Sequence, residues 1–316
     1  MRTIHTLKIA VCAMALAASA GAEELGPSFR YDLGDLRKTD PKLVLFDEAK
    51  AIDPGISELS AIAVAGPDRI LVAGDKALVA LRNDGTTVAR VALDAPASCL
   101  AVDGNGLAYL GVKDHIEVLD ADGKRIGVWA AVPGQPLLTS IAAGSNDVYL
   151  ADAGNQVVWH YDKAGKLQSK IDGRQTPKQG KGFIIPSPHF DVAFGPDGAL
   201  WVVDPGRHLV RRYGQDGAVQ TTWGKTAMTI EGFCGCCNPT DIAIDGAGNF
   251  YTSEKGLVRV KMYGPDGAFL GVVAGPEQFA EDDTGLDLAV DSLGRLLVLD
   301  PKAGKLRVFV KKGDRK

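Results

Sequence analysis

Short apolar segments with alanine at their centre recur six times along the chain. Each is followed by a glycine turn, a second apolar segment that often ends in an acid, a third segment, an Asp-Gly or related turn, and a fourth segment. Such a unit of roughly 40 to 50 residues is typical of a four-stranded propeller blade. The pattern therefore predicts an all-β chain of six blades, with inner strands centred on Ala63, Ala101, Ala142, Ala193, Ala243 and Ala289.

The sixth unit is one strand short. After residues 306–310 the chain continues into a charged segment, residues 311–316. A lone apolar segment, residues 42–46, precedes the first unit. If it pairs with residues 306–310, it closes the ring and covers an exposed strand edge. The alternative is a separate small N-terminal element.

The repeat resembles the NHL family. Asn238-Pro239-Thr240-Asp241-Ile242-Ala243-Ile244-Asp245 and the following Gly246-Ala247-Gly248-Asn249-Phe250-Tyr251 match its pattern of proline, apolar-alanine-apolar-acid, glycine turn and tyrosine. The resemblance covers about residues 57–312. It implies a six-bladed β-propeller of the NHL/TolB-like kind, and the short sixth unit predicts that an N-terminal strand closes the ring. It leaves the function open, because propellers support many activities.

The N-terminus is typical of an export signal. Arg2 and Lys8 precede or begin an apolar run that is too short to span a bilayer, and Ala20-Gly21-Ala22 provides a cleavage pattern. Cys12 lies inside that run and should leave with the signal. We expect a signal peptide at residues 1–22, an N-terminal segment with the closing strand at 23–56, and the propeller at 57–316, in a periplasmic or secreted protein.

Charge adds little to this description. The net charge is −4, and no long basic run is present, so nothing indicates nucleic-acid binding. No later segment is long and apolar enough to span a membrane.

Two long loops indicate where a functional site would lie. Residues 173–188 lead into the inner strand of the fourth unit, and residues 224–238 lead into that of the fifth. We call the face of the ring that carries such loops the top face. Loops on a rigid scaffold commonly carry sites, so we expect the functional centre where units four and five meet.

The second loop contains Cys234, Cys236 and Cys237. Thiolates bind zinc, copper, iron or an iron–sulfur centre, and they also perform thiol–disulfide exchange. A structural disulfide is the third interpretation. Neighbouring cysteines pair with strain, so a local disulfide should join Cys234 to Cys236 or Cys237. The spacing matches no standard four-cysteine zinc pattern.

This loop also resembles that of a bacterial group of exported NHL-repeat proteins with a Phe-Cys-Gly-Cys-Cys-Asn-Pro segment. Pro205-Gly206-Arg207-His208, Ser-Glu-Lys-Gly-Leu at 253–257 and Val-Ala-Gly-Pro-Glu at 273–277 match as well. The resemblance covers about residues 183–280 and implies a location for the site, without a reaction.

Several polar residues fall on the same face. Three acids lie two positions before the central alanine of the last three units, and we expect them to converge at the mouth of the channel; the alternative is that each accepts local backbone N–H bonds. Cys99 occupies this position in unit two, where we expect it to be a small buried apolar residue. The candidate ligand-binding residues are His189, Asp191, Arg207, His208, Asp241, Glu254, Lys255 and Asp287.

Three classes of function follow. The first is a binding module for a protein partner or a small ligand on the top face. The second is a metal or redox protein centred on Cys234, Cys236 and Cys237. The third is a metal-dependent hydrolase or lyase similar to lactonase-type and amidoglycolate-lyase-type propellers, with Asp191, Asp241 and Asp287 as ligands. The sequence favours a binding module whose cysteine loop binds a metal or acts in redox chemistry, and it leaves catalysis undecided.

Overall fold

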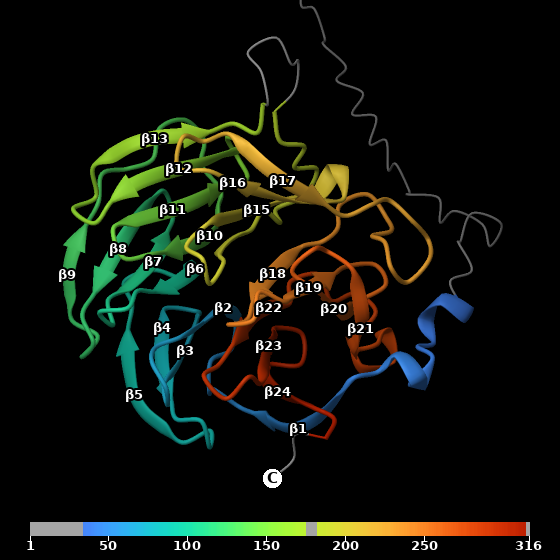
Figure 1. The fold of residues 1–316 in the computed structure, drawn as a ribbon. Coiled ribbons are helices and arrows are strands. Elements are labelled where there is room, and N and C mark those ends of the chain that lie inside the picture. The colour runs from blue at the N-terminus through green and yellow to red at the C-terminus, as the bar shows by residue number, and fades with distance from the viewer. Residues whose placement is uncertain (1–33, 175–181, 314–316) are drawn as a thin grey trace, which may run out of the picture. The chain divides into compact units, whose positions relative to one another are not determined.

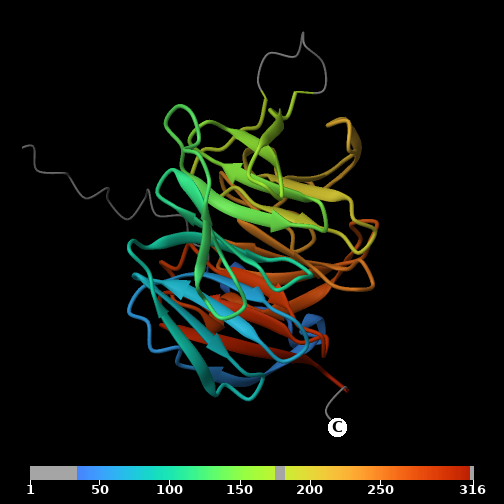
Figure 2. The same ribbon diagram turned by 90° about the vertical axis from the view of Figure 1, so that its left-hand side faces the viewer.

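The computed structural model describes residues 34–174 and 182–313, and all of these except Gly34 belong to one compact unit, Asp35–Lys316. The expected signal peptide at residues 1–22 lies outside the described residues. Six four-stranded antiparallel sheets make up the unit as the blades of a β-propeller (Figure 1). Figure 2 shows the sheets of the first three blades from their outer side. The predicted fold class is confirmed.

Strands run outward from the channel in chain order. The first three blades consist of β2 (Leu59–Val64), β3 (Ile70–Gly74), β4 (Ala77–Leu81) and β5 (Thr87–Ala92); β6 (Ala97–Val102), β7 (Ala108–Val112), β8 (His115–Leu119) and β9 (Arg125–Val128); and β10 (Leu138–Ala143), β11 (Asp147–Asp152), β12 (Val157–Asp162) and β13 (Leu167–Ile171).

The last three blades repeat this order with one exception, since the outer strand of blade six comes from the N-terminal side. They consist of β14 (Val192–Phe194), β15 (Leu200–Asp204), β16 (Leu209–Tyr213) and β17 (Val219–Trp223); β18 (Asp241–Ile244), β19 (Phe250–Glu254), β20 (Arg259–Tyr263) and β21 (Phe269–Ala274); and β22 (Asp287–Val290), β23 (Leu296–Asp300), β24 (Lys305–Lys311) and β1 (Phe46–Ile52). Short 3-10 turns lie at Asp35–Arg37, Pro41–Leu43, Pro205–Arg207 and Pro276–Gln278.

The six alanine-centred strands are innermost, as predicted. Each contacts the inner strands of both neighbouring blades, and together they complete a ring. Side chains near the axis crowd one another, so alanine fits where a larger residue would overpack. The apolar core lies between adjacent blades: Leu297 and Leu299 of blade six, for example, pack with Ile70 and Val72 of blade one.

The ring closes through an N-terminal strand, but not the one expected. β1 pairs with β24 from Phe46 opposite Lys311 to Ile52 opposite Leu306, and Figure 1 shows the two strands side by side. Residues 42–46 were therefore the wrong segment. Asp40 accepts the backbone N–H of Lys42 and begins a 3-10 turn there. The apolar pattern was misleading because an outermost strand is half exposed, and only Phe46 and Ile52 of β1 are buried.

Candidate functional site

Six equivalent side chains form a ring at the top of the channel. Each lies two positions before the central alanine of its inner strand. In blade order they are Ala61, Cys99, Ser140, Asp191, Asp241 and Asp287. Carboxylates therefore occupy this position in blades four to six only.

Each of the three acids binds the next blade. A carboxylate oxygen accepts the backbone N–H that precedes the neighbouring blade's central alanine, and Ser140 contacts Val192 N in the same way, at 3.3 Å. The three contacts are Asp191 Oδ2 with Ile242 N (2.6 Å), Asp241 Oδ1 with Leu288 N (3.1 Å), and Asp287 Oδ2 with Ile62 N (2.8 Å). Backbone donors were one interpretation of these acids, but the donors come from the next blade, so the acids link successive inner strands.

The three carboxyl groups also act on one another. Burial raises the pKa of Asp191 to about 7, and the charge of Asp287 adds to this effect. Burial likewise raises the pKa of Asp287 to about 6 and that of Asp241 well above its usual value. Asp241 and Asp287 share a hydrogen bond, which requires a proton on one of them. The expected convergence of the acids is therefore observed.

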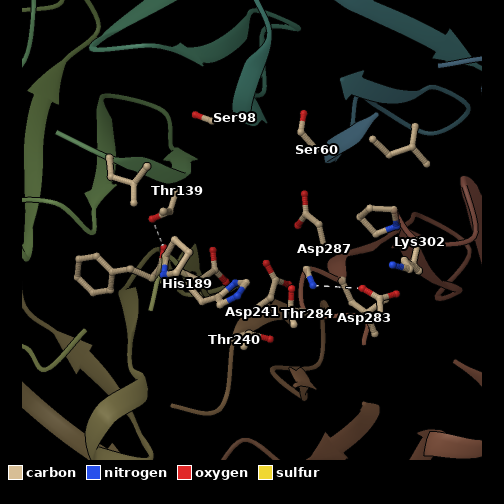
Figure 3. A pocket seen from close by; sticks show the side chains of 18 of the residues that line it. Ser60, Ser98, Thr139, His189, Thr240, Asp241, Asp283, Thr284, Asp287 and Lys302 are labelled. Atoms are coloured by element: carbon tan, nitrogen blue, oxygen red, sulfur yellow. Dashed lines mark hydrogen bonds between the residues drawn. The ribbon is translucent and has the colours of Figure 1, made fainter. Parts of the chain in front are cut away.

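A cavity of about 590 Å³ opens on the top face above these acids. Figure 3 shows Asp241 and Asp287 near its middle. The same three carboxyl groups line a second cavity of about 320 Å³ inside the channel, so they separate the two spaces. Other polar residues that line the upper cavity are Ser60, Ser98, Thr139, Thr240, Asp283 and Lys302.

His189 also lines the upper cavity. Burial and then the charge of Lys255 lower its pKa to about 4, so the imidazole is neutral at physiological pH. Asp191 lies two residues further along the chain, in the same cavity, with a pKa of about 7. A neutral imidazole and proton-bearing carboxyl groups therefore share one space, which is a composition suited to acid–base chemistry.

Part of the cavity was missed at the sequence level. The loop into blade six supplies Asp282, Asp283 and Thr284, and Lys302 from the β23–β24 turn pairs with Asp282 at 2.6 Å. Burial and a hydrogen bond with Asp300 raise the pKa of Asp283 to about 6. The acidic run at residues 281–283, placed directly before an inner strand, was the available signal.

The cysteine loop rests on a buried charged cluster at blade five. Glu254 pairs with Lys261 at 2.5 Å and with Arg259 at 3.1 Å, and all three side chains are buried. Lys261 Nζ also donates to the loop carbonyl of Gly232 at 2.6 Å and lies 4.6 Å from the ring centroid of Phe233. Burial lowers the pKa of Lys261 to about 8. Glu254 therefore supports the loop from below and does not line the upper cavity.

The expected partners Arg207 and His208 hold loops as well. Arg207 pairs with Asp204 at 2.7 Å and donates to the carbonyl of Gly182, in the loop into blade four. His208 is buried and its Nδ1 lies 2.9 Å from the carbonyl oxygen of Asn238, in the loop into blade five. Neither residue lines the upper cavity.

The three loop cysteines separate into two groups. Cys234 Sγ lies 4.0 Å from Glu254 Oε2 and 3.9 Å from Arg259 Nη2. Cys236 Sγ lies 3.1 Å from Cys237 Sγ. All four described cysteines are free, so the disulfide from Cys234 to a neighbour, one of the three interpretations of this loop, is not present. Cys234 turns to the buried cluster because the loop backbone is fixed there, where Asn238 Nδ2 donates to its carbonyl at 2.7 Å.

The structure thus divides the predicted site residues. His189, Asp191, Asp241 and Asp287 meet in the upper cavity, whereas Arg207, His208 and Glu254 support loops. Lys255 links the two groups, because its charge acts on both His189 and Cys237. Within residues 34–174 and 182–313, no three His, Cys, Asp or Glu side chains are grouped as a metal ion would require.

Comparison with known proteins supports the fold assignment and does not identify a function. No protein-family profile matches the chain, and no curated protein matches it. Among solved structures it is similar to a streptogramin B lyase, with 13% identity, a TM-score of 0.60, and coverage of 85% of this chain and 98% of that chain. It is also similar to a catalytically inactive variant of virginiamycin B lyase from Staphylococcus aureus with quinupristin (14%, TM-score 0.55, 80% of each chain). The WD40 propeller domain of Doa1 is a third (12%, TM-score 0.54, 81% of this chain and 79% of that chain).

These similarities establish a shared propeller architecture among proteins that include a lyase and a WD40 domain. None of the described helices is long and apolar enough to cross a membrane.

Proposed function

We propose that this protein is a binding module that takes a small cationic ligand, such as an amine, in the upper cavity. The positive group would lie against Asp191, Asp241 and Asp287. The observation that carries this proposal is the difference between blades. Ala61 and Cys99 hold the equivalent position in blades one and two, so the fold does not require a carboxyl group there.

Burial of these acids is unfavourable for the free protein. Their pKa values are set mainly by burial, by neighbouring acids and by hydrogen-bond donors. No Lys, Arg or His of the described residues is among the main causes of these shifts. A buried carboxylate without a cation either carries a proton or attracts one positive partner. A cationic ligand would replace the shared protons and relieve the repulsion between Asp241 and Asp287.

The cavity has the dimensions of a small-molecule site. Its volume of about 590 Å³ lies within the roughly 300–1,000 Å³ that such pockets occupy. Hydroxyl groups of Ser60, Ser98 and Thr139 also line the cavity. Each donates to a backbone carbonyl, so its oxygen is left to accept a hydrogen bond from the ligand. Recognition would therefore combine one charge with several neutral hydrogen bonds.

Calorimetric titration with putrescine, and with butanediol as the uncharged analogue, tests the proposal. We expect only the amine to bind, with release of protons to the buffer. Its affinity should rise as pH increases from 6 to 8, because the pKa values of Asp287 and Asp191 are about 6 and about 7. Asp191→Asn or Asp287→Asn should weaken binding about tenfold or more, which is roughly 1.4 kcal/mol.

Asp122→Asn is the matched control, because Asp122 is exposed in a turn between β8 and β9. It should bind putrescine as the unmodified protein does. Equal binding of the amine and the diol, or unchanged affinity in both ring variants, would refute the proposal.

A second candidate is a hydrolase or lyase, favoured by the neutral imidazole of His189 in the same cavity as the proton-bearing Asp191. In this role His189 would accept a proton from the substrate and Asp191 would donate one to the leaving group. Incubation with a panel of lactones and cyclic esters, followed by mass spectrometry, would detect turnover. His189→Gln should abolish it without loss of the fold, whereas a binding module shows no product with either protein.

Two further proposals concern the export signal and the cysteine loop. We propose that the protein is cleaved after residue 22 and acts in the periplasm or outside the cell; N-terminal sequencing of material from the periplasm would test the cleavage site. Metal binding by the loop cysteines stays a hypothesis, and elemental analysis of the purified protein addresses it.

A further inference from the structure

Two adjacent cysteines on the rim of the top face are placed for direct reaction with each other. Cys236 Sγ and Cys237 Sγ are in contact at 3.1 Å. Cys236 is exposed to solvent and Cys237 is buried. A pair with one accessible and one protected sulfur has the arrangement that thiol–disulfide exchange uses, since the outer thiol meets the external disulfide and the inner thiol resolves the intermediate.

The surroundings of the pair favour a thiolate on the inner sulfur. Burial opposes ionisation of Cys237, but the charge of Lys255 and the contact with the Cys236 thiol outweigh it and lower its pKa. Cys236 shows the opposite shift, because its thiol donates to Cys237 and its pKa rises. Within the pair, these opposite shifts favour the proton on Cys236 and the charge on Cys237, close to Lys255.

The other two described cysteines are unsuited to this chemistry. Burial, followed by the charge of Glu254, raises the pKa of Cys234. Burial raises the pKa of Cys99 to about 12, and its sulfur packs against Gly111, where even an added Cβ would lie 2.4 Å from it. Two of the four described thiols are therefore reactive candidates, and they are the two that touch.

We propose that Cys236 and Cys237 form a thiol–disulfide exchange site that is oxidised by a low-molecular-weight or protein disulfide. Cys236 passes its proton to Cys237 and attacks one sulfur of the external disulfide. The other half leaves as a thiolate, which takes up the proton from Cys237. Cys237, again a thiolate after this transfer, attacks Cys236 Sγ and expels the second half, which gains a proton from water. One intramolecular disulfide forms, one external disulfide becomes two thiols, and two electrons move from the protein.

This site is independent of the proposed amine binding, because neither sulfur lines the upper cavity. It also differs from the structural disulfide that was one interpretation of the sequence, in which Cys234 would take part. A disulfide between neighbouring cysteines is strained, and strained disulfides are the labile kind that take part in exchange. The loop keeps Cys234 against Glu254 and Arg259, so Cys237 is the available partner of Cys236.

Oxidation of the full-length protein by glutathione disulfide tests the proposal. We expect the thiol count to fall by two, and peptide mass spectrometry should show a closed ring between Cys236 and Cys237. With Cys237→Ser, a mixed disulfide with glutathione should accumulate on Cys236. With Cys236→Ser, the buried Cys237 should react many times more slowly.

Two control variants separate this chemistry from general thiol reactivity. Cys234→Ser should leave the loss of two thiols unchanged. Lys255→Met should slow closure about threefold per unit rise in the pKa of Cys237, since the tenfold loss of thiolate is half offset by higher nucleophilicity. Circular dichroism would establish that each variant is folded. Failure to close the pair in the folded protein, or closure that requires Cys234, would overturn the proposal.

Discussion

Blades one and two differ from blades four to six at three equivalent positions. In the ring around the channel, Ala61 and Cys99 are replaced by aspartates in the later blades. The other two positions are the last residue of the second strand and the residue seven positions after it. Blade one carries Gly74 and Leu81 there, and blade two carries Val112 and Leu119. The later blades carry Asp204 with Arg211, Glu254 with Lys261, and Asp300 with Arg307. Each of these three pairs is a salt bridge.

The difference shows that one architecture tolerates both apolar and charged versions of these positions. The charged pairs at the end of the second strand are balanced, because a cation is built in beside each acid. The ring acids are not balanced by such a partner within the described residues, and their pKa values rise accordingly. Balanced acids support loops, whereas unbalanced acids keep the capacity to take up a proton or a ligand.

The largest expected effect is at a balanced acid. Glu254→Gln would leave Arg259 and Lys261 buried without an anion, and removal of one partner of a buried ion pair costs about 3–5 kcal/mol. Chemical denaturation at pH 8 should show this loss in the free energy of unfolding. A change below about 1 kcal/mol would mean that the cluster is solvated and that the contrast between the two kinds of acid is wrong.

The same amide substitution at an unbalanced acid should have the opposite sign. Asp241→Asn keeps an oxygen for the N–H of Leu288 and removes the repulsion with Asp191 and Asp287. We expect the free energy of unfolding at pH 8 to rise, because burial and the neighbouring acids raise the pKa of Asp241 and make its charged form unfavourable in the folded protein. Denaturation of the two variants side by side decides the comparison, and destabilisation by Asp241→Asn would contradict it.

The dependence of stability on pH provides a second view of the ring. The pKa of Asp191 is 3.8 in its ordinary state and about 7 in the folded protein. Between pH 3.8 and pH 7 the folded protein therefore keeps a proton on Asp191 that the unfolded chain has released. Its contribution to stability is therefore full below pH 3.8 and is lost as pH rises through 7. Asp191→Asn should flatten the stability curve of the protein between pH 4 and 7, and an unchanged slope would exclude this group as the cause.

The smallest effect is expected at the neutral half of the ring. Cys99→Ser gives blade two the residue type that blade three has in Ser140. The change is nearly isosteric, and we expect less than about 1.5 kcal/mol of destabilisation from the buried hydroxyl. Amine affinity should not change, which calorimetry would show; a large change would extend the binding site beyond the acids.

The sequence was sufficient for the features that repeat. Six alanine-centred strands, their inner position and the three ring acids follow from local pattern, because every blade places the same residue at the same depth. The charged pairs seven residues apart, such as Asp204 with Arg211, were also visible in the sequence and were missed. A search for recurring acid–base spacing would have found them.

Features that depend on contacts between distant segments were harder to predict from the sequence. β1 is half exposed and contains three charged residues, so its local sequence pattern is weak and its position depends on its pairing with β24. The separation of Cys234 from Cys236 and Cys237 depends on Glu254 and Arg259, which lie on other strands. Whether the repeat belongs to the NHL family, and whether residues 1–22 are a signal peptide, stay predictions.

The pairing of β1 with β24 has a consequence for the order in which the molecule is made. Glu48 and Arg307, which join the two strands, lie 259 positions apart. On the ribosome β1 is synthesised before every blade, yet its partner is among the last strands to appear. Until then the inner strands can stack as an open arc, with unpaired edges at both ends that are prone to aggregation. Closure is therefore a late event, and a chain cut before Lys305 should leave β1 without a partner and the arc open.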